Sequence, residues 1–215
     1  SNPEMNWRLS QLDSFSIVSN SDCHSPSKIG REATVFEIEP NFASLRGALK
    51  NPKKGEEILY TIEFYPEEGK YHYSGHRNCN YVQSPKDAGR DGTTCPVCKK
   101  TLTVGVMHRV EELADKPYGY VSKKRPPYKS LVPLLEIVAE SVGIVSITSK
   151  KVNDAYLAVL KKFGTEFSVL LDEPLLNIKQ YDAHLSDGIK RMREGKINIK
   201  PGYDGVFGKV KIWKE

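Results

Sequence analysis

The chain has 215 residues, enough for one large domain or for roughly two or three small ones. Hydrophobic residues make up 39% of it, and the mean hydropathy is −0.48, which favours small units over one large core. No apolar run approaches the roughly 18–20 residues of a membrane span, and no signal-peptide pattern opens the sequence. We therefore exclude a membrane protein and expect a cytoplasmic one. The first two residues resemble an expression remnant, and the abrupt start suggests a fragment of a longer protein.

The net charge is +5, a basic bias that by itself is weak evidence for a nucleic-acid partner. Its distribution says more, because residues 185–215 hold eight lysines and arginines against four acidic residues. We expect a DNA-binding tail here or, alternatively, a solvated helix face followed by a polar hairpin.

Residues 1–56 have the pattern of the end of an α/β unit. A short apolar strand is predicted at 15–18, and period-2 alternation predicts a half-buried strand at 33–38. A helix is expected at 42–50. The turn cluster Asn-Pro-Lys-Lys-Gly that follows marks the first predicted boundary.

Residues 57–125 form the second predicted segment. A strand is expected at 58–65, a polar, glycine-containing loop at 84–93 and a second strand at 102–107. A short helix or turn follows at 110–115. The basic, helix-breaking run Lys-Lys-Arg-Pro-Pro ends the segment.

Residues 126–215 are predicted to be mainly helical, so the fold class is α+β. One helix begins near Pro133 and ends at Gly143, a second runs over 151–163, and a third runs over 183–194. Two alternating stretches, 196–200 and 209–213, predict a terminal β-hairpin. Its loop contains three glycines. The second helix is predicted to bury one face, made of Val152, Tyr156, Val159, Leu160 and Phe163.

The middle segment contains two pairs of metal-ligating residues, each pair with two residues between its members. His76 and Cys79 form the first pair, and Cys95 and Cys98 form the second. A turn of this length lets both side chains face one ion, and two such turns complete the tetrahedral shell of zinc. A full shell predicts a structural zinc, which a small unit with little core needs as a staple.

Two alternatives remain open for these residues. Cys95 and Cys98 would be a redox pair in a thioredoxin-like context, but the required βαβ pattern is absent. His72, in the sequence Tyr-His-Tyr, is an alternative to His76 as the fourth ligand. The remaining cysteine, Cys23, is expected to be a small buried packing residue.

Asp22 and His24 follow directly after the predicted strand at 15–18. In α/β barrels, ligands gather where strands end and loops begin, and carboxylate with imidazole suits a zinc, manganese or iron hydrolytic site. The alternative is that Asp22 caps a turn and His24 is incidental.

Longer stretches carry a resemblance to a known family. VSNSDCHSPSK at 18–28 is similar to the last metal-binding motif of the PHP (polymerase and histidinol phosphatase) phosphoesterase superfamily. Further motifs follow in order along the chain. Together with the first motif, they resemble endonuclease Q, a DNA-repair nuclease family of archaea and some bacteria, over nearly the whole chain. These motifs are GKYHYSGHRNC at 69–79, CPVC at 95–98, LTVGVMHRVEELAD at 102–115, RPPYKSLVPL at 125–134 and PGYDGVFG at 201–208.

The resemblance implies a metal-dependent endonuclease that nicks DNA 5′ of deaminated bases such as uracil and hypoxanthine. It implies the end of a PHP barrel at 1–56, a zinc-ribbon-like β domain at 57–125 and a helical domain at 126–215. Asp22 and His24 match the family's last metal ligands, and zinc, manganese or magnesium would fill the PHP site of the intact enzyme. Because the His-x-His motif and the middle ligands are missing, we expect these residues alone to be inactive.

DNA is the expected partner, and a small-molecule ligand is not expected. Basic side chains would contact phosphates and position the duplex without reading sequence. Aromatic side chains on the glycine-rich loop would stack on bases or, alternatively, anchor the hairpin to the helices. The candidates are Lys190, Arg191, Arg193, Lys209 and Lys211 for phosphates, and Tyr203 and Phe207 for bases.

Three other functions compete with this one. A zinc-stabilised nucleic-acid-binding module without chemistry fits the same residues. A helicase, a label that relatives have carried, would need a Gly-x-x-x-x-Gly-Lys-[Ser/Thr] phosphate loop, which is absent. A PHP phosphatase acting on small molecules is disfavoured by the basic tail and the zinc segment.

Overall fold

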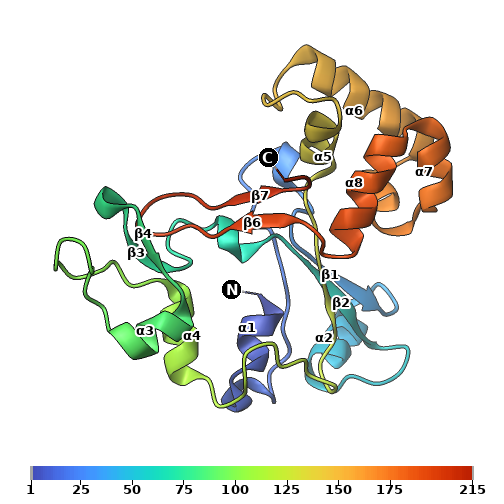
Figure 1. Ribbon diagram of the computed structural model, residues 1–215. Coiled ribbons are helices and arrows are strands. Elements are labelled where there is room, and N and C mark those ends of the chain that lie inside the picture. The colour runs from blue at the N-terminus through green and yellow to red at the C-terminus, as the bar shows by residue number, and fades with distance from the viewer. Residues whose placement is uncertain (1, 215) are drawn as a thin grey trace. The chain divides into compact units, whose positions relative to one another are not determined.

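A computed structural model describes residues 2–214, so Ser1, half of the supposed expression remnant, and Glu215 lie outside the described residues. The chain forms two compact units (Figure 1). The first holds the residues up to Lys129 together with Ile199–Lys209, and the second holds Ser130–Asn198 and the residues from Val210 onward. Residues 1–56 and 57–125 thus fall in one unit, and their division into two domains stays a prediction.

The chain contains both helices and short strands in small sheets, which confirms the α+β class. In the first unit, β1 (Ala33–Glu37) and β2 (Glu57–Glu63) pair antiparallel, with a register shift between Val35 and Phe36. β5 (Tyr128–Ser130) completes a sheet of order β1-β2-β5. The strands predicted at 33–38 and 58–65 are therefore confirmed.

α2 (Phe42–Lys50) joins these two strands, as predicted. It begins where the side chain of Asn41 accepts a hydrogen bond from the backbone N–H of Ser44. The helix buries only Ala48, whereas Phe42 is 79% exposed. The identification of this segment with the end of a PHP barrel stays a prediction.

The N-terminal segment departs from the sequence expectations. Asn2, set aside as part of a remnant, is buried and caps α1 (Pro3–Trp7), because its Oδ1 accepts from the N–H of Met5 at 3.0 Å. The strand predicted at 15–18 is wrong, since this segment has no regular secondary structure. A strand needs a ladder of backbone bonds, and the nearby backbone of Ser19 instead bonds the hydroxyl of Thr34. Short 3₁₀ turns cover Ser10–Leu12 and Pro26–Lys28.

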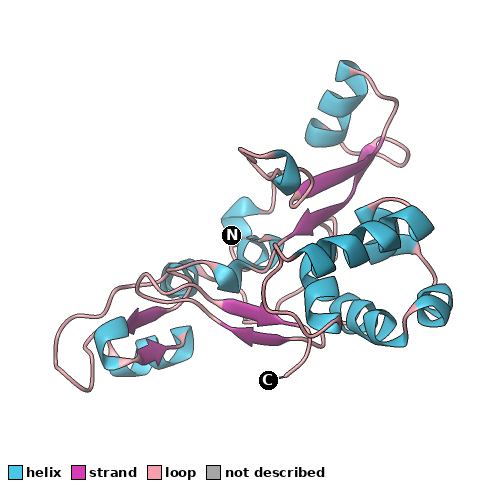
Figure 2. Cartoon of the chain, turned by 90° about the horizontal axis from the view of Figure 1, so that it is seen from above, coloured by secondary structure: helices cyan, strands magenta, loops and turns pink. Residues whose placement is uncertain are grey.

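The remainder of the first unit is a lobe of short elements, which Figure 2 shows as small strands beside helices. We call residues 66–113 the zinc lobe, after the ion that the sequence predicts there. The loop predicted at 84–93 instead contains a helix, and the strand predicted at 102–107 is wrong. Backbone bridges there are confined to Thr101 and Thr103, after which a helix begins. The elements are the 3₁₀ turns η3 (Pro66–Glu68) and η4 (Arg77–Cys79), the strands β3 (Ser74–His76) and β4 (Tyr81–Gln83), and the helices α3 (Pro85–Asp91) and α4 (Val106–Leu113).

The second unit is helical, and the three helices predicted from periodicity and capping residues are confirmed. Ser149 caps α6, and Asp182 caps α8 by accepting from two backbone N–H groups. The π-helix and α7 were not predicted. The helical elements are α5 (Leu134–Ser141), α6 (Lys150–Phe163), the π-helix η5 (Ser168–Asp172), α7 (Leu175–Tyr181) and α8 (Ala183–Arg193), and their core includes Leu134, Ile137, Val152, Ile178 and Ile189.

The chain ends in the predicted hairpin, formed by β6 (Asn198–Lys200) and β7 (Lys209–Lys211). Ile212, just after β7, is fully buried, and the indole N–H of Trp213 donates to Asp187 at 2.9 Å. None of the helices in the described part of the chain is long and apolar enough to cross a membrane.

Candidate metal centre

Four side chains from two short turns converge in the zinc lobe. The ligand atoms of His76, Cys79, Cys95 and Cys98 all lie within 4.8 Å of one another, and His76 Nδ1 is 3.2 Å from Cys98 Sγ. None of the four cysteines is disulfide-bonded. Bonds of about 2.0–2.3 Å from one zinc to nitrogen and sulfur fit separations of this size. The predicted ligand set is therefore brought together and can hold one metal ion.

The two turns share a backbone design that explains their spacing. Each is followed by a residue with left-handed backbone directly after its second ligand, namely Asn80 with φ 49° and Lys99 with φ 61°. Around the second pair, the N–H of Cys95 donates to the carbonyl of Lys100, and the N–H of Lys99 donates back to the carbonyl of Cys95. This reversal turns both ligands of a pair toward one point.

The protonation of the thiols fits a site built for a cation. Burial raises the pKa of Cys95, but hydrogen bonds from the backbone of Cys98 and Val97 and from the side chain of His76 outweigh it and bring the pKa to about 6. Burial and the hydrogen bonds with Cys98 and Cys95 raise the pKa of Cys79 to about 11. Several thiolates cannot share so small a volume without a neutralising ion. A divalent ion with a preference for sulfur and nitrogen would relieve that conflict.

His72, the alternative ligand, lies outside the cluster. Its side chain is buried and its ring stacks on Tyr73 with centroids 5.0 Å apart. Burial lowers the pKa of His72 to about 4, against a hydrogen bond with the backbone of Pro66 that raises it. The ligand atoms that converge are those of His76 and the three cysteines, without His72, which decides the choice in favour of His76.

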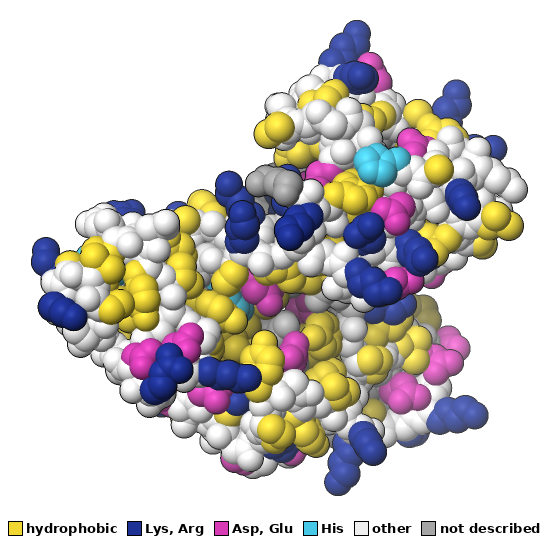
Figure 3. All heavy atoms as spheres, in the orientation of Figure 1, with side chains coloured by type: hydrophobic (Ala, Val, Ile, Leu, Met, Phe, Trp, Pro, Cys, Tyr) yellow, Lys and Arg dark blue, Asp and Glu magenta, His cyan; other side chains and the backbone are white. Residues whose placement is uncertain are grey.

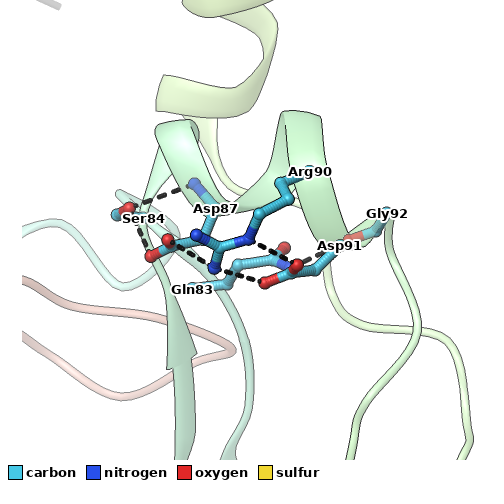
Figure 4. Close-up of polar contacts among 6 residues, drawn as sticks. All are labelled: Gln83, Ser84, Asp87, Arg90, Asp91 and Gly92. Atoms are coloured by element: carbon cyan, nitrogen blue, oxygen red, sulfur yellow. Dashed lines mark hydrogen bonds and ion pairs between the residues drawn. The ribbon is translucent and has the colours of Figure 1, made fainter.

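A capped helix spans the sequence between the two ligand pairs. Ser84 caps α3, since its hydroxyl accepts from the N–H of Asp87, and Figure 4 shows the surrounding polar contacts. Arg90 donates to Asp87 at 3.1 Å and to Asp91 at 2.7 Å. Beneath them, the buried Gln83 donates to the carbonyl of Gly92 at 2.9 Å. The connection is thus ordered rather than a free loop.

The glycine-rich loop 201–208 docks on this lobe through Asp204. One carboxylate oxygen accepts from the N–H of Arg77 at 2.7 Å, and the other accepts from the hydroxyl of Thr103. The Thr103 hydroxyl and then the Arg77 N–H hold the pKa of Asp204 below its usual value. Arg77 lies between the first two ligands, so Asp204 ties the loop directly to the His76–Cys79 turn. Sequence reasoning missed this residue, whose only signal was an Asp-Gly pair typical of a tight turn.

Two glycines let the loop lie against the lobe's backbone. The N–H of Gly202 donates to the carbonyl of Glu67, and the N–H of Gly208 donates to that of Glu68. A Cβ at Gly208 would overlap the carbonyl oxygen of Glu67, and one at Gly202 would overlap that of Gly69. No other residue type permits so close an approach of two backbones.

The two aromatic residues of the loop have different environments. The Tyr203 hydroxyl donates to Asn80 at 2.9 Å, and its ring lies against Gly75. It thus anchors the loop to the zinc lobe. Phe207 is 66% exposed, and its only ring partner in the described part of the chain is Lys70, with Nζ 4.5 Å from the ring centroid. A stacking role for either ring stays a prediction.

The basic side chains that were predicted to contact phosphates differ in the contacts that they make within the structure. Arg193 donates to the backbone carbonyls of Val169 and Leu170 in the π-helix and of Glu173 just after it. Arg191 pairs with Asp187, Lys211 with Glu140, and Lys190 with Glu194. Lys209 is exposed and has no ion pair with any residue that the structure describes. Their contacts with phosphates stay predictions.

Asp22 and His24 are both exposed, and no other potential ligands gather around them among residues 2–214. Asp22 has a left-handed backbone, with φ 44°, a conformation that Asp and Asn adopt more readily than most residues. Cys23, expected to be buried, is half-exposed. The assignment of Asp22 and His24 to a hydrolytic metal site stays a prediction.

Several known proteins resemble this chain in sequence. The family model described as the MJ0043 C-terminal domain matches residues 133–196. Protein MJ0043 of Methanocaldococcus jannaschii is 33% identical over 210 residues, which are 94% of this chain and 26% of that protein. Protein YqxK of Bacillus subtilis is 30% identical over 213 residues, which are 97% of this chain and 50% of YqxK. The chain thus spans half or less of these relatives.

Solved structures match the chain over its whole length. The lesion-specific endonuclease PfuEndoQ of Pyrococcus furiosus has a TM-score of 0.87 and 33% identity, with 54% of that chain covered. Endonuclease Q in complex with a 27-mer duplex containing an abasic lesion has a TM-score of 0.80 and 32% identity, again with 54% covered.

The chain has an α+β fold and a Cys₃His cluster. Its fold matches part of a lesion-specific endonuclease. More particularly, its fold and sequence are similar to those of endonuclease Q, as its motifs predicted. Its membership of the PHP superfamily stays a prediction.

Proposed function

We propose that this chain is the C-terminal part of a metal-dependent DNA-repair endonuclease of the endonuclease Q type. The intact enzyme nicks DNA on the 5′ side of deaminated bases such as uracil and hypoxanthine. The zinc lobe and the basic C-terminal residues bind the DNA. The observation that carries the proposal is the match of all 215 residues to a lesion-specific endonuclease at a TM-score of 0.87.

The ion in the zinc lobe has a structural role in this proposal. His76, Cys79, Cys95 and Cys98 would supply four ligands to one ion, which would leave no position for a water or a substrate in a tetrahedral shell. The ion therefore supplies folding energy to a lobe of short elements, and the chemistry belongs elsewhere. Asp22 and His24 would supply ligands to the hydrolytic site together with residues that this chain lacks.

Recognition of a damaged base requires access to its edge, which an intact stack hides. Extrusion of the base from the duplex provides that access and costs less for a poorly paired base. Support for DNA as the partner comes from the 27-mer duplex that is bound in the structure of a neighbour.

Cleavage by the full-length protein tests the proposal. With divalent metal present, we expect nicks 5′ of uracil and hypoxanthine in a labelled duplex, and none in the matched undamaged duplex. The 215-residue chain alone should bind the duplex without cutting it. Absence of cleavage by the full-length protein on every damaged duplex would instead favour a zinc-stabilised binding module without chemistry.

The contribution of the hairpin to DNA binding follows from salt dependence. In the full-length protein, changing Lys209 and Lys211 to Ala should lower the slope of log K against log salt by about 0.9 for each phosphate that is no longer neutralised. Fluorescence anisotropy at four or five salt concentrations measures the slope. Lys54→Ala, an exposed lysine in the turn after α2, is the matched control and should leave it unchanged. An unaltered slope in the double variant would remove the hairpin from the DNA footprint.

A further inference from the structure

Exposed aromatic and cationic side chains of the zinc lobe lie around the tip of the loop 201–208. Phe207 is 66% exposed and Tyr71 is 52% exposed. Lys70 lies over the Phe207 ring, and the carbonyl of Lys70 accepts from the N–H of Gly205. A Cβ at Gly205 would stand 3.8 Å from the Tyr71 hydroxyl. We call Lys70, Tyr71, Arg77 and residues 205–207 the loop-tip platform.

The charged side chains among the residues of this platform, Lys70 and Arg77, are both cations. Asp204 is engaged by Thr103 and by the backbone of Arg77. One oxygen of Glu67 is buried, and burial raises the pKa of that carboxyl. Lys70 and Arg77 are both exposed. Figure 3 shows apolar side chains exposed on the lobe beside Lys and Arg.

The platform combines exposed aromatic rings with cations on a backbone that hydrogen bonds hold in place. Such a surface suits a nucleotide, because a flat, uncharged base can stack on the rings while the cations contact its phosphates. A nucleobase in a duplex hides its faces in the stack, whereas an unpaired base offers them for stacking on aromatic side chains. Arginine and lysine next to the stacked base reach its flanking phosphates.

We propose that the loop-tip platform binds an unpaired nucleobase, which stacks on the rings of Phe207 and Tyr71. Lys70 and Arg77 contact the neighbouring phosphates. This inference rests on the proposed function, since it takes the DNA as given and assigns where an unpaired base is held. It separates the two loop aromatics: Phe207 contacts the base, and Tyr203 fixes the loop through Asn80 and Gly75.

The position of the platform depends on the metal-binding turn. Asp204 holds the loop to the backbone N–H of Arg77, which lies between the ligands His76 and Cys79. Asp204→Asn leaves an amide that can accept only through one atom, so one of its two contacts is weakened. Asp204→Asn is therefore a positioning change: we expect weaker stacking with the zinc content unchanged.

The test uses the full-length protein and a duplex that carries 2-aminopurine opposite an abasic site. Wild-type protein should quench the 2-aminopurine fluorescence on binding. Phe207→Leu and Tyr71→Leu keep apolar bulk but remove the ring, and each should weaken binding by about 5- to 100-fold and reduce the quenching. Neither should change the salt slope, whereas Lys70→Gln should lower it by about 0.7–0.9. Phe207→Tyr should restore both binding and quenching.

A matched control is Tyr118→Leu, which removes another exposed aromatic flanked by cations, Arg8 and Lys86. It should bind and quench as wild type does, and metal analysis should find one zinc in every variant. Wild-type affinity and quenching in both Phe207→Leu and Tyr71→Leu would overturn the platform while leaving DNA binding intact. An equal loss in Tyr118→Leu would also overturn it. A wild-type protein that binds no DNA would instead refute the proposed function itself.

Discussion

Cys95→Ser is expected to abolish stoichiometric zinc binding and to unfold the zinc lobe. Cys95 is fully buried, it belongs to the ligand cluster, and its sulfur accepts hydrogen bonds from the backbone N–H groups of Val97 and Cys98. Serine offers a harder, shorter ligand that zinc does not hold in such a site. Because structural zinc contributes about 10–16 kcal/mol of apparent binding energy, the lobe cannot compensate for its loss.

Metal analysis of the purified chain measures this directly, with one zinc per chain in the wild type and none in the variant. Thermal unfolding should show a lowered transition in Cys95→Ser, and a chelator should lower that of the wild type in the same way. Cys23→Ser is the control, since Cys23 lies outside the cluster and is half-exposed. Retention of a full equivalent of zinc by Cys95→Ser would refute the assignment of the four ligands.

The second large effect concerns catalysis in the full-length protein. Asp22→Asn and His24→Gln should each lower the rate of nicking at uracil by at least about 100-fold, because in the proposed function both residues are ligands of the metal that would activate water. Both side chains are exposed in this chain, so neither variant should disturb its folding. Asparagine also tolerates the left-handed backbone that Asp22 adopts.

Single-turnover cleavage with saturating enzyme separates the chemical step from DNA binding. We expect anisotropy to give DNA affinities within about threefold of wild type, because the phosphate contacts are proposed elsewhere. Cys23→Ser, between the two residues, should cut at the wild-type rate. Unimpaired cleavage by both variants would show that Asp22 and His24 are surface residues of a turn, which was the alternative at the level of sequence.

The contrast between the zinc ligands and the 15–18 segment shows what local patterns encode. The spacing of His76, Cys79, Cys95 and Cys98 identified a cluster that the fold then brings together. An apolar run of four residues predicted a strand, but a strand exists only when another segment supplies its hydrogen bonds. Similarly, the alternation at 102–107 resembled a strand, yet Gly105 approaches the backbone of Tyr73 and the chain turns there into α4.

By itself, the sequence determined the helices with caps and periodicity, α2, α6 and α8, and the two ligand turns, because their signals lie within a few residues of one another. Only the tertiary structure decided that His76 and not His72 completes the cluster, and that Arg193 binds carbonyls of the π-helix. Only the fold, too, brings Asp204 to Arg77, 127 residues away in sequence. Contacts over such separations depend on how whole elements pack, which no short window of sequence specifies.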